Sequence, residues 1–147
     1  MVSHRRERGT FLGSFEVAFR GVAEAWSRER NFRVQVSYVC VVVGLLAWLR
    51  PEKAEALLVT ASLFALLSAE LMNTALERAV DLVTAEHHPL ARSAKDIAAG
   101  SVLVIAIGTA LLCLGVLAPH LPWSSALAFG SFLLGVSTVR FGWGWSR

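Results

Sequence analysis

Residues 56–81 read ALLVTASLFALLSAELMNTALERAVD, and this stretch decides the fold. Its first 14 residues carry no charge, and the first carboxylate, Glu70, is followed by six further uncharged residues. A helix of about 20 predominantly apolar residues is what the roughly 30 Å hydrocarbon core of a bilayer requires. The stretch therefore predicts a transmembrane helix over residues 56–76.

The rest of the chain repeats this pattern. Apolar runs over residues 34–49 and 97–118 predict two further spans, and residues 123–139, which carry no charge, predict a fourth. The 147 residues are 55% hydrophobic and only 17% charged, and mean hydropathy is +0.56. A soluble domain of this size cannot bury so much apolar surface. We expect an all-α integral membrane bundle, with a core domain over residues 1–118 and an extension over residues 119–147.

A different kind of helix precedes the first span. Phe15, Phe19, Val22 and Trp26 share one face of residues 15–30, with charged side chains on the other face, as in helices that lie on a membrane surface. The net charge is +3, but it is unevenly placed, because half of the 14 Lys and Arg residues precede the first span. This bias predicts a cytoplasmic N-terminus, and the apolar remainder argues against a nucleic-acid partner.

Carboxylates occur where a membrane helix should not carry them. Burying one acid costs about 2.5–3.5 kcal/mol on insertion scales, so Glu70 needs a use or a partner. At 100° per residue, Glu70, Asn73, Glu77 and Asp81 fall within an arc of about 80° on one helix face. The alternative for Glu77 and Asp81 is a solvated helix end. A shared polar stripe of acids predicts a cation beside it.

Further acids and bases lie on either side of this stripe. If the surface helix continues, Glu29 faces the membrane helices, and the purely structural interpretation gives it Arg33 as an ionic partner. Between the second and third spans lies a polar segment that contains Glu86, His87, His88, Arg92, Lys95 and Asp96. Its spacing matches no structural zinc site, and the chain has neither a GxxxxGK[ST] loop nor a GxGxxG motif. Acids able to hold Mg²⁺ and a nearby lysine nevertheless suffice, in principle, for phosphoryl transfer.

These motifs together resemble those of the small prokaryotic diacylglycerol kinases. The resemblance covers about residues 11–118 and is carried by ELMNTALERAVD at residues 70–81, EHHPL at 86–90 and AKD at 94–96. ERNFR at residues 29–33 is similar to the undecaprenol kinase branch of this family. The resemblance implies a membrane lipid kinase of phospholipid or lipid-carrier metabolism. It further implies a homotrimer of the inner (plasma) membrane, whose active sites are shared between protomers and face the cytoplasm.

The same resemblance implies roles for individual residues. It implies that Glu70 is the catalytic base and that Asn73 is a further catalytic residue. It implies that Glu29 and Glu77 bind Mg²⁺ and also contribute to the nucleotide site. The remaining ATP contacts are Glu86, His87, His88, Lys95 and Asp96.

The sequence departs from the family in two places. Where some members have an arginine and a tyrosine that touch the nucleotide, this chain has Thr10 and Val17. No role carries over to residues 119–147. Two alternatives stay open: diacylglycerol or undecaprenol as the lipid, and a proton-coupled transporter or channel subunit that uses Glu70 as its carrier site.

Overall fold

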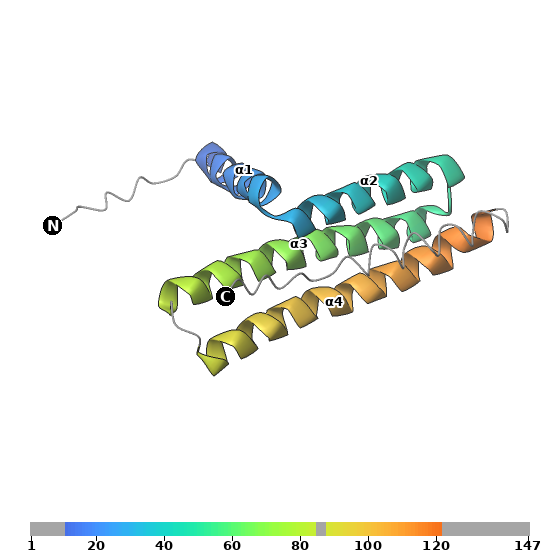
Figure 1. Cartoon of the computed structure of the whole chain (residues 1–147). Coiled ribbons are helices and arrows are strands. Elements are labelled where there is room, and N and C mark those ends of the chain that lie inside the picture. Colours follow the sequence, from blue (N-terminus) through green and yellow to red (C-terminus); the bar gives the residue numbers. More distant parts are fainter. Residues whose placement is uncertain (1–10, 85–87, 122–147) are drawn as a thin grey trace.

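The computed structural model describes residues 11–84 and 88–121, and these form helices without any strand. The four α-helices are α1 (Phe11–Arg28), α2 (Arg30–Leu49), α3 (Lys53–Val83) and α4 (Pro89–Leu117), and a short 3-10 helix, η1 (Ala118–His120), follows α4. Figure 1 shows α2, α3 and α4 side by side as a bundle, with α1 set at an angle to them. The predicted all-α class is therefore confirmed.

Three of these helices are long and apolar enough to cross a membrane, and they contain the three predicted spans of the core domain. Each helix is longer than its apolar run: α2 begins at Arg30 rather than at residue 34, and α4 begins at Pro89 rather than at residue 97. Hydropathy detects only the apolar part of a helix. The polar start of α4 is helical because proline suits the first turn, and because His88 Nδ1 accepts a hydrogen bond from the backbone N–H of Leu90 at 3.2 Å.

The turn between α2 and α3 is defined by local backbone chemistry. Arg50 ends α2 in the left-handed conformation, with φ 51° and ψ 55°, and Pro51 prevents the helix from continuing. Glu55 then accepts a hydrogen bond from the backbone N–H of Glu52 at 3.1 Å, which satisfies a donor at the start of α3. α2 and α3 are therefore antiparallel neighbours.

The core lies where the three long helices meet. Val42 of α2, Leu63 of α3 and Leu117 of α4 are at most 1% exposed. Thr109 of α4 adds a hydrogen bond to the backbone carbonyl of Ser62 on α3, at 3.3 Å. The outer faces of the bundle expose many large apolar side chains, which suits lipid rather than water.

Helix length places one end of the bundle outside the hydrocarbon. The 31 residues of α3 extend over about 46 Å at 1.5 Å per residue, against a bilayer core of about 30 Å. In Figure 1 the excess length of α3 lies beyond the start of α2, next to α1 and to the start of α4. This end carries the polar residues of the predicted site.

The surface helix is separated from the first span by a single residue. Glu29 is extended, with φ −99° and ψ 114°, between α1 and α2. Arg33 stabilises the break, because its Nη1 donates to the last carbonyls of α1, those of Trp26 at 3.0 Å and Ser27 at 3.2 Å. The aromatic face of α1 is open, and Phe19 is 71% exposed, as expected for a helix on a membrane surface.

The predicted fourth span over residues 123–139 lies outside the described residues. It stays a prediction, as does the division between the core and residues 119–147.

Candidate active site

The buried carboxylate of α3 has a polar partner on the first span. Glu70 is 3% exposed, and its Oε2 accepts a hydrogen bond from Gln35 Nε2 of α2 at 3.0 Å. The acid that the sequence places within an apolar span is therefore buried between helices and has a polar partner. A hydrogen bond to a buried carboxylate is charge-assisted, and it fixes the direction in which the other oxygen points.

The next polar residue of the stripe extends it towards the end of the bundle. Asn73 donates a hydrogen bond from Nδ2 to Glu77 Oε1 at 3.0 Å, one turn further along α3. Asn73 Oδ1 and Gln35 Oε1 are both buried without a hydrogen-bond partner among the described residues. Buried polar atoms are rarely left unpaired in folded proteins, so these two acceptors are suited to a hydrogen-bond donor from a bound substrate.

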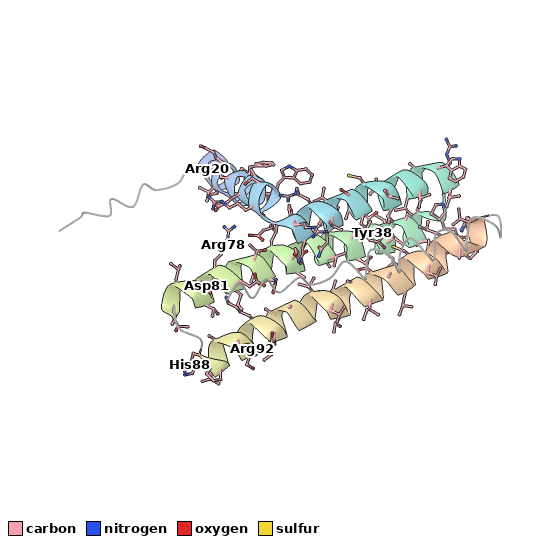
Figure 2. All side chains as sticks on the ribbon, in the orientation of Figure 1. Arg20, Tyr38, Arg78, Asp81, His88 and Arg92 are labelled. Carbon is pink, nitrogen blue, oxygen red and sulfur yellow. The ribbon has the colours of Figure 1, made fainter. Side chains whose placement is uncertain are left out.

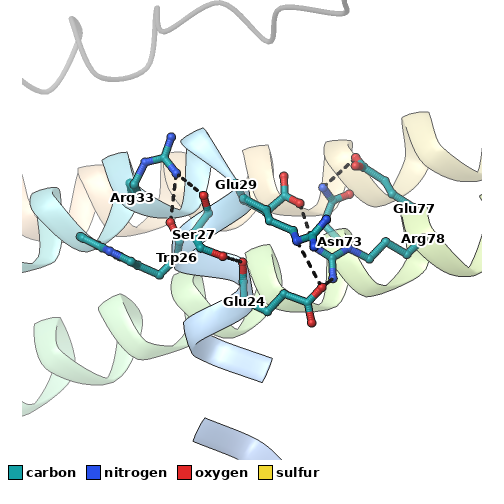
Figure 3. A network of polar contacts seen from close by, with 9 residues as sticks. Glu24, Trp26, Ser27, Glu29, Arg33, Asn73, Glu77 and Arg78 are labelled. Carbon is teal, nitrogen blue, oxygen red and sulfur yellow. Dashed lines mark hydrogen bonds and ion pairs between the residues drawn. The ribbon is translucent and has the colours of Figure 1, made fainter. Parts of the chain in front are cut away.

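Glu29 reaches the same end of α3 from the break between α1 and α2. Its Oε1 pairs with Arg78 Nη2 at 3.1 Å, and Arg78 Nη1 pairs with Glu24 of α1 at 2.9 Å. The expected pairing with Arg33 is wrong. The surface helix does not continue through Glu29, and Arg33 instead caps the end of α1. Figure 3 shows Arg78 between the two carboxylates, beside the Asn73–Glu77 pair.

The predicted nucleotide residues lie at the facing ends of α3 and α4. Lys95 forms an ion pair with Asp81, and Asp96 pairs with Arg92 at 3.8 Å. Figure 2 shows Asp81, His88 and Arg92 gathered at this end of the bundle, where α3 finishes and α4 begins.

The structure says less about the other residues that were predicted to contact the nucleotide. His88 serves as the N-cap of α4, whereas Glu86, His87 and Thr10 lie outside the described residues. Val17 is exposed on α1.

The acidic groups suit a hard cation, although they do not enclose one. Within residues 11–84 and 88–121, no three His, Cys, Asp or Glu side chains lie close enough to hold a metal ion together. Glu29 and Glu77 each use only Oε1 in their recorded contacts. One or two carboxylates, completed by water and substrate phosphates, are the usual protein contribution to a Mg²⁺ site, so the donor set fits Mg²⁺ bound together with a nucleotide.

Two residues of this site were not recognised in the sequence. The sequence predicts no role in the site for Gln35 of α2 or for Arg78 of α3. A signal was present for both. Gln35 is a polar residue within a helix that must cross a membrane, and Arg78 is a cation within the acidic segment that was predicted to need one.

Comparison with known proteins identifies the family of this helix bundle. The family model described as prokaryotic diacylglycerol kinase matches residues 16–117, which include α2, α3, α4 and most of α1. The chain belongs to the prokaryotic diacylglycerol kinase family.

Individual relatives of this kinase family agree. An undecaprenol kinase of Bacillus subtilis is 40% identical over 120 residues, which are 80% of this chain and 96% of that protein. A diacylglycerol kinase of Synechocystis is 36% identical over 69% of this chain and 58% of its own length. A diacylglycerol kinase of Escherichia coli K12 is 30% identical over 61% of this chain and 74% of its own length.

Family membership makes the chain a membrane lipid kinase, an enzyme that uses a lipid and ATP. The transporter or channel alternative for Glu70 is not favoured. The buried Glu70 and the more exposed Asn73 and Glu77 lie along one face of the continuous helix α3.

Proposed function

We propose that this lipid kinase transfers the γ-phosphate of ATP to the hydroxyl of undecaprenol at the cytoplasmic surface of the plasma membrane. One observation carries the mechanism: the buried Glu70, held by Gln35, shares a helix face with the more exposed Glu77. The choice of lipid is supported by the relative named undecaprenol kinase, which this chain matches over 96% of that protein's length. Diacylglycerol is the second candidate, supported by the names of the other relatives.

In this mechanism Glu70 is the general base. The lipid hydroxyl enters from the bilayer and gives its proton to Glu70 while its oxygen attacks the γ-phosphorus. The bond between that phosphorus and the bridging oxygen of ADP breaks, so that a lipid phosphate and ADP leave. Asn73 lies one turn from Glu70 and would orient either Glu70 or the transferred group.

Glu29 and Glu77 would hold Mg²⁺ together with the nucleotide phosphates. The ion would neutralise charge that develops on the transferred phosphoryl group. This assignment is supported by the approach of the two acids to one end of α3 from different segments (Figure 3). Because the Asn73 amide contacts Glu77, it connects the metal-binding end of the stripe to the base.

The nucleotide would lie between the end of α3 and the start of α4. Lys95 is positioned by Asp81 to neutralise phosphate charge, and Asp96 would orient the nucleotide. Glu86, His87 and His88 complete the proposed set. Since the aqueous end of the bundle is also where the basic N-terminal segment is expected, the active site would face the cytoplasm.

The exposed apolar faces of the bundle leave room for further copies of the chain. We include in the proposal a homotrimer whose active sites are shared between neighbouring protomers, as the family resemblance implies. Cross-linking of the purified protein in lipid nanodiscs tests this: a ladder that stops at the trimer is expected, and a monomer alone would contradict it.

The function is tested by supplying both lipids to the purified full-length protein with MgATP. Radiolabelled phosphate should appear in the lipid extract, and the specificity constant should be higher for undecaprenol than for diacylglycerol. The Glu70→Gln variant serves as the catalytic control. A preference for diacylglycerol would overturn the choice of lipid, whereas no labelled lipid from either substrate would overturn the proposed reaction.

A further inference from the structure

Arg78 connects three parts of the site. It directly follows Glu77 on α3, and its guanidinium lies between two carboxylates that come from other segments. Nη1 is 2.9 Å from Glu24 Oε1 on α1, and Nη2 is 3.1 Å from Glu29 Oε1 at the helix break. In the part of the chain that the structure describes, Arg78 is the one cation paired with Glu29.

Glu29 needs such a partner to be held in place. It sits at an extended residue between two helices, where no side chain one turn away on its own helix fixes its orientation. A glutamate has three rotatable side-chain bonds, so a carboxylate at such a position is mobile unless it is hydrogen-bonded. Arg78 contacts Oε1, which leaves Oε2 available for another ligand. Partners that bind a ligating carboxylate in this way commonly determine how well it holds its metal.

We propose that Arg78 is a positioning residue that sets the Glu29 carboxylate at a fixed separation from Glu77. The inference rests on the proposed function, which assigns Mg²⁺ to Glu29 and Glu77. Because residues 77 and 78 are consecutive, an ion pair from Arg78 to Glu29 fixes Glu29 relative to the same turn of α3 that carries Glu77.

Glu24 anchors the other arm of the guanidinium. A planar fork with two separate N–H groups can bridge two carboxylates, and the compact ammonium of a lysine cannot do so with the same geometry. The bridge also ties α1 to α3, so the position of the surface helix and the position of Glu29 are set by one side chain. Glu24 itself need not touch the metal or the nucleotide.

The opposing interpretation is that Arg78 only neutralises the acids. A positive charge beside a metal site repels the cation, and on that basis removing Arg78 should tighten metal binding. The positioning role predicts the opposite sign. The direction of the change in metal affinity therefore distinguishes the two roles.

The experiment measures Mn²⁺ binding by electron paramagnetic resonance, on the purified full chain with a non-hydrolysable ATP analogue. Arg78→Gln should weaken Mn²⁺ binding by about 10-fold, and Arg78→Lys should restore part of the loss. The matched control is Arg28→Gln. Arg28 also pairs with Glu24, at 3.6 Å, but its side chain is 71% exposed and makes no recorded contact with Glu29, so this variant should bind Mn²⁺ normally.

Two further variants distinguish loss of the bridge from misfolding of Arg78→Gln. Glu24→Gln removes the anchor without changing α3, and should weaken Mn²⁺ binding less than Arg78→Gln. The Glu24→Gln/Arg78→Gln double variant should bind no more weakly than Arg78→Gln alone, because both changes break one bridge. The Glu24→Gln result keeps the inference testable if Arg78→Gln does not fold.

The outcome for Glu29→Gln decides which idea fails. Weaker Mn²⁺ binding in Glu29→Gln, together with unchanged or tighter binding in Arg78→Gln, would overturn the role of Arg78 and leave the metal assignment intact. Unchanged binding in Glu29→Gln would overturn the proposed metal site itself. Weakening of Mn²⁺ binding in Arg28→Gln equal to that in Arg78→Gln would show a non-specific disturbance of α1 around Glu24 and would also overturn the inference.

Discussion

Replacing Gln35 by leucine tests how far catalysis depends on the orientation of Glu70. The substitution nearly preserves side-chain volume while it removes the hydrogen bond from Nε2 to Glu70 Oε2. It also removes Gln35 Oε1, a buried acceptor without a partner among the described residues. Gln35→Leu leaves the buried Glu70 Oε2 unpaired, and the loss of the unsatisfied Gln35 Oε1 offsets only part of that cost, so we expect a lower thermal midpoint in a variant that still folds.

The kinetic effect should be much larger. A hydrogen bond to a charged group contributes about 1.5–3 kcal/mol, and screening by water is small here because Glu70 is 3% exposed. If this energy holds the base in its reactive direction, its loss lowers kcat by about 10- to 150-fold at 1.36 kcal/mol per factor of ten. The KM for ATP should not change, because Gln35 is not in the proposed nucleotide site.

The assay is steady-state lipid phosphorylation in nanodiscs, with ATP varied at saturating lipid. Ser37→Ala is the matched control, since Ser37 lies two residues further along α2 and donates its hydrogen bond to the backbone carbonyl of Arg33 at 2.9 Å. A folded Gln35→Leu variant with a kcat within twofold of wild type, or one in which only the KM for ATP changes, would refute the positioning of Glu70 by Gln35.

Three further predictions follow from the proposed site and topology. Glu70→Gln should fold normally and lose nearly all turnover, because an amide cannot take the proton, and near-normal kinase rates would remove this residue from the mechanism. Glu29→Gln and Glu77→Gln should each raise the Mg²⁺ concentration needed for half-maximal activity by about 10-fold, whereas unchanged Mg²⁺ titrations in both would contradict the metal assignment. Ser146→Cys should resist an impermeant thiol reagent in intact cells if residues 123–139 cross the membrane, and labelling would place the tail outside.

The sequence alone predicted the structural features that depend on a single helix. Periodicity placed Glu70, Asn73, Glu77 and Asp81 on one face of a single helix, and α3 is continuous through all four. The burial of Glu70 followed from its position within an apolar run. These conclusions need only the helical repeat and the thickness of a bilayer.

Contacts between helices could not be predicted from the hydropathy pattern. Whether Gln35 of α2 meets Glu70 of α3 depends on how two helices are rotated against each other, and hydropathy does not encode that rotation. The extended conformation of Glu29 was not predicted, because residues 27–31, SRERN, contain neither proline nor glycine. The alternative that paired Glu29 with Arg33 depended on a continuous helix, and it fails because the helix breaks at Glu29.

The continuity of α3 has a consequence for how this enzyme can vary in length. Its buried proposed base and its more exposed acids are carried by one uninterrupted helix, so their relative phase is fixed by the residue count between Glu70 and Asp81. Inserting one residue there would rotate everything beyond it by about 100° and advance it by about 1.5 Å. Glu77 would leave Asn73, and Asp81 would turn away from Lys95. Substitutions at the other positions of this interval are therefore admissible, but insertions and deletions are not.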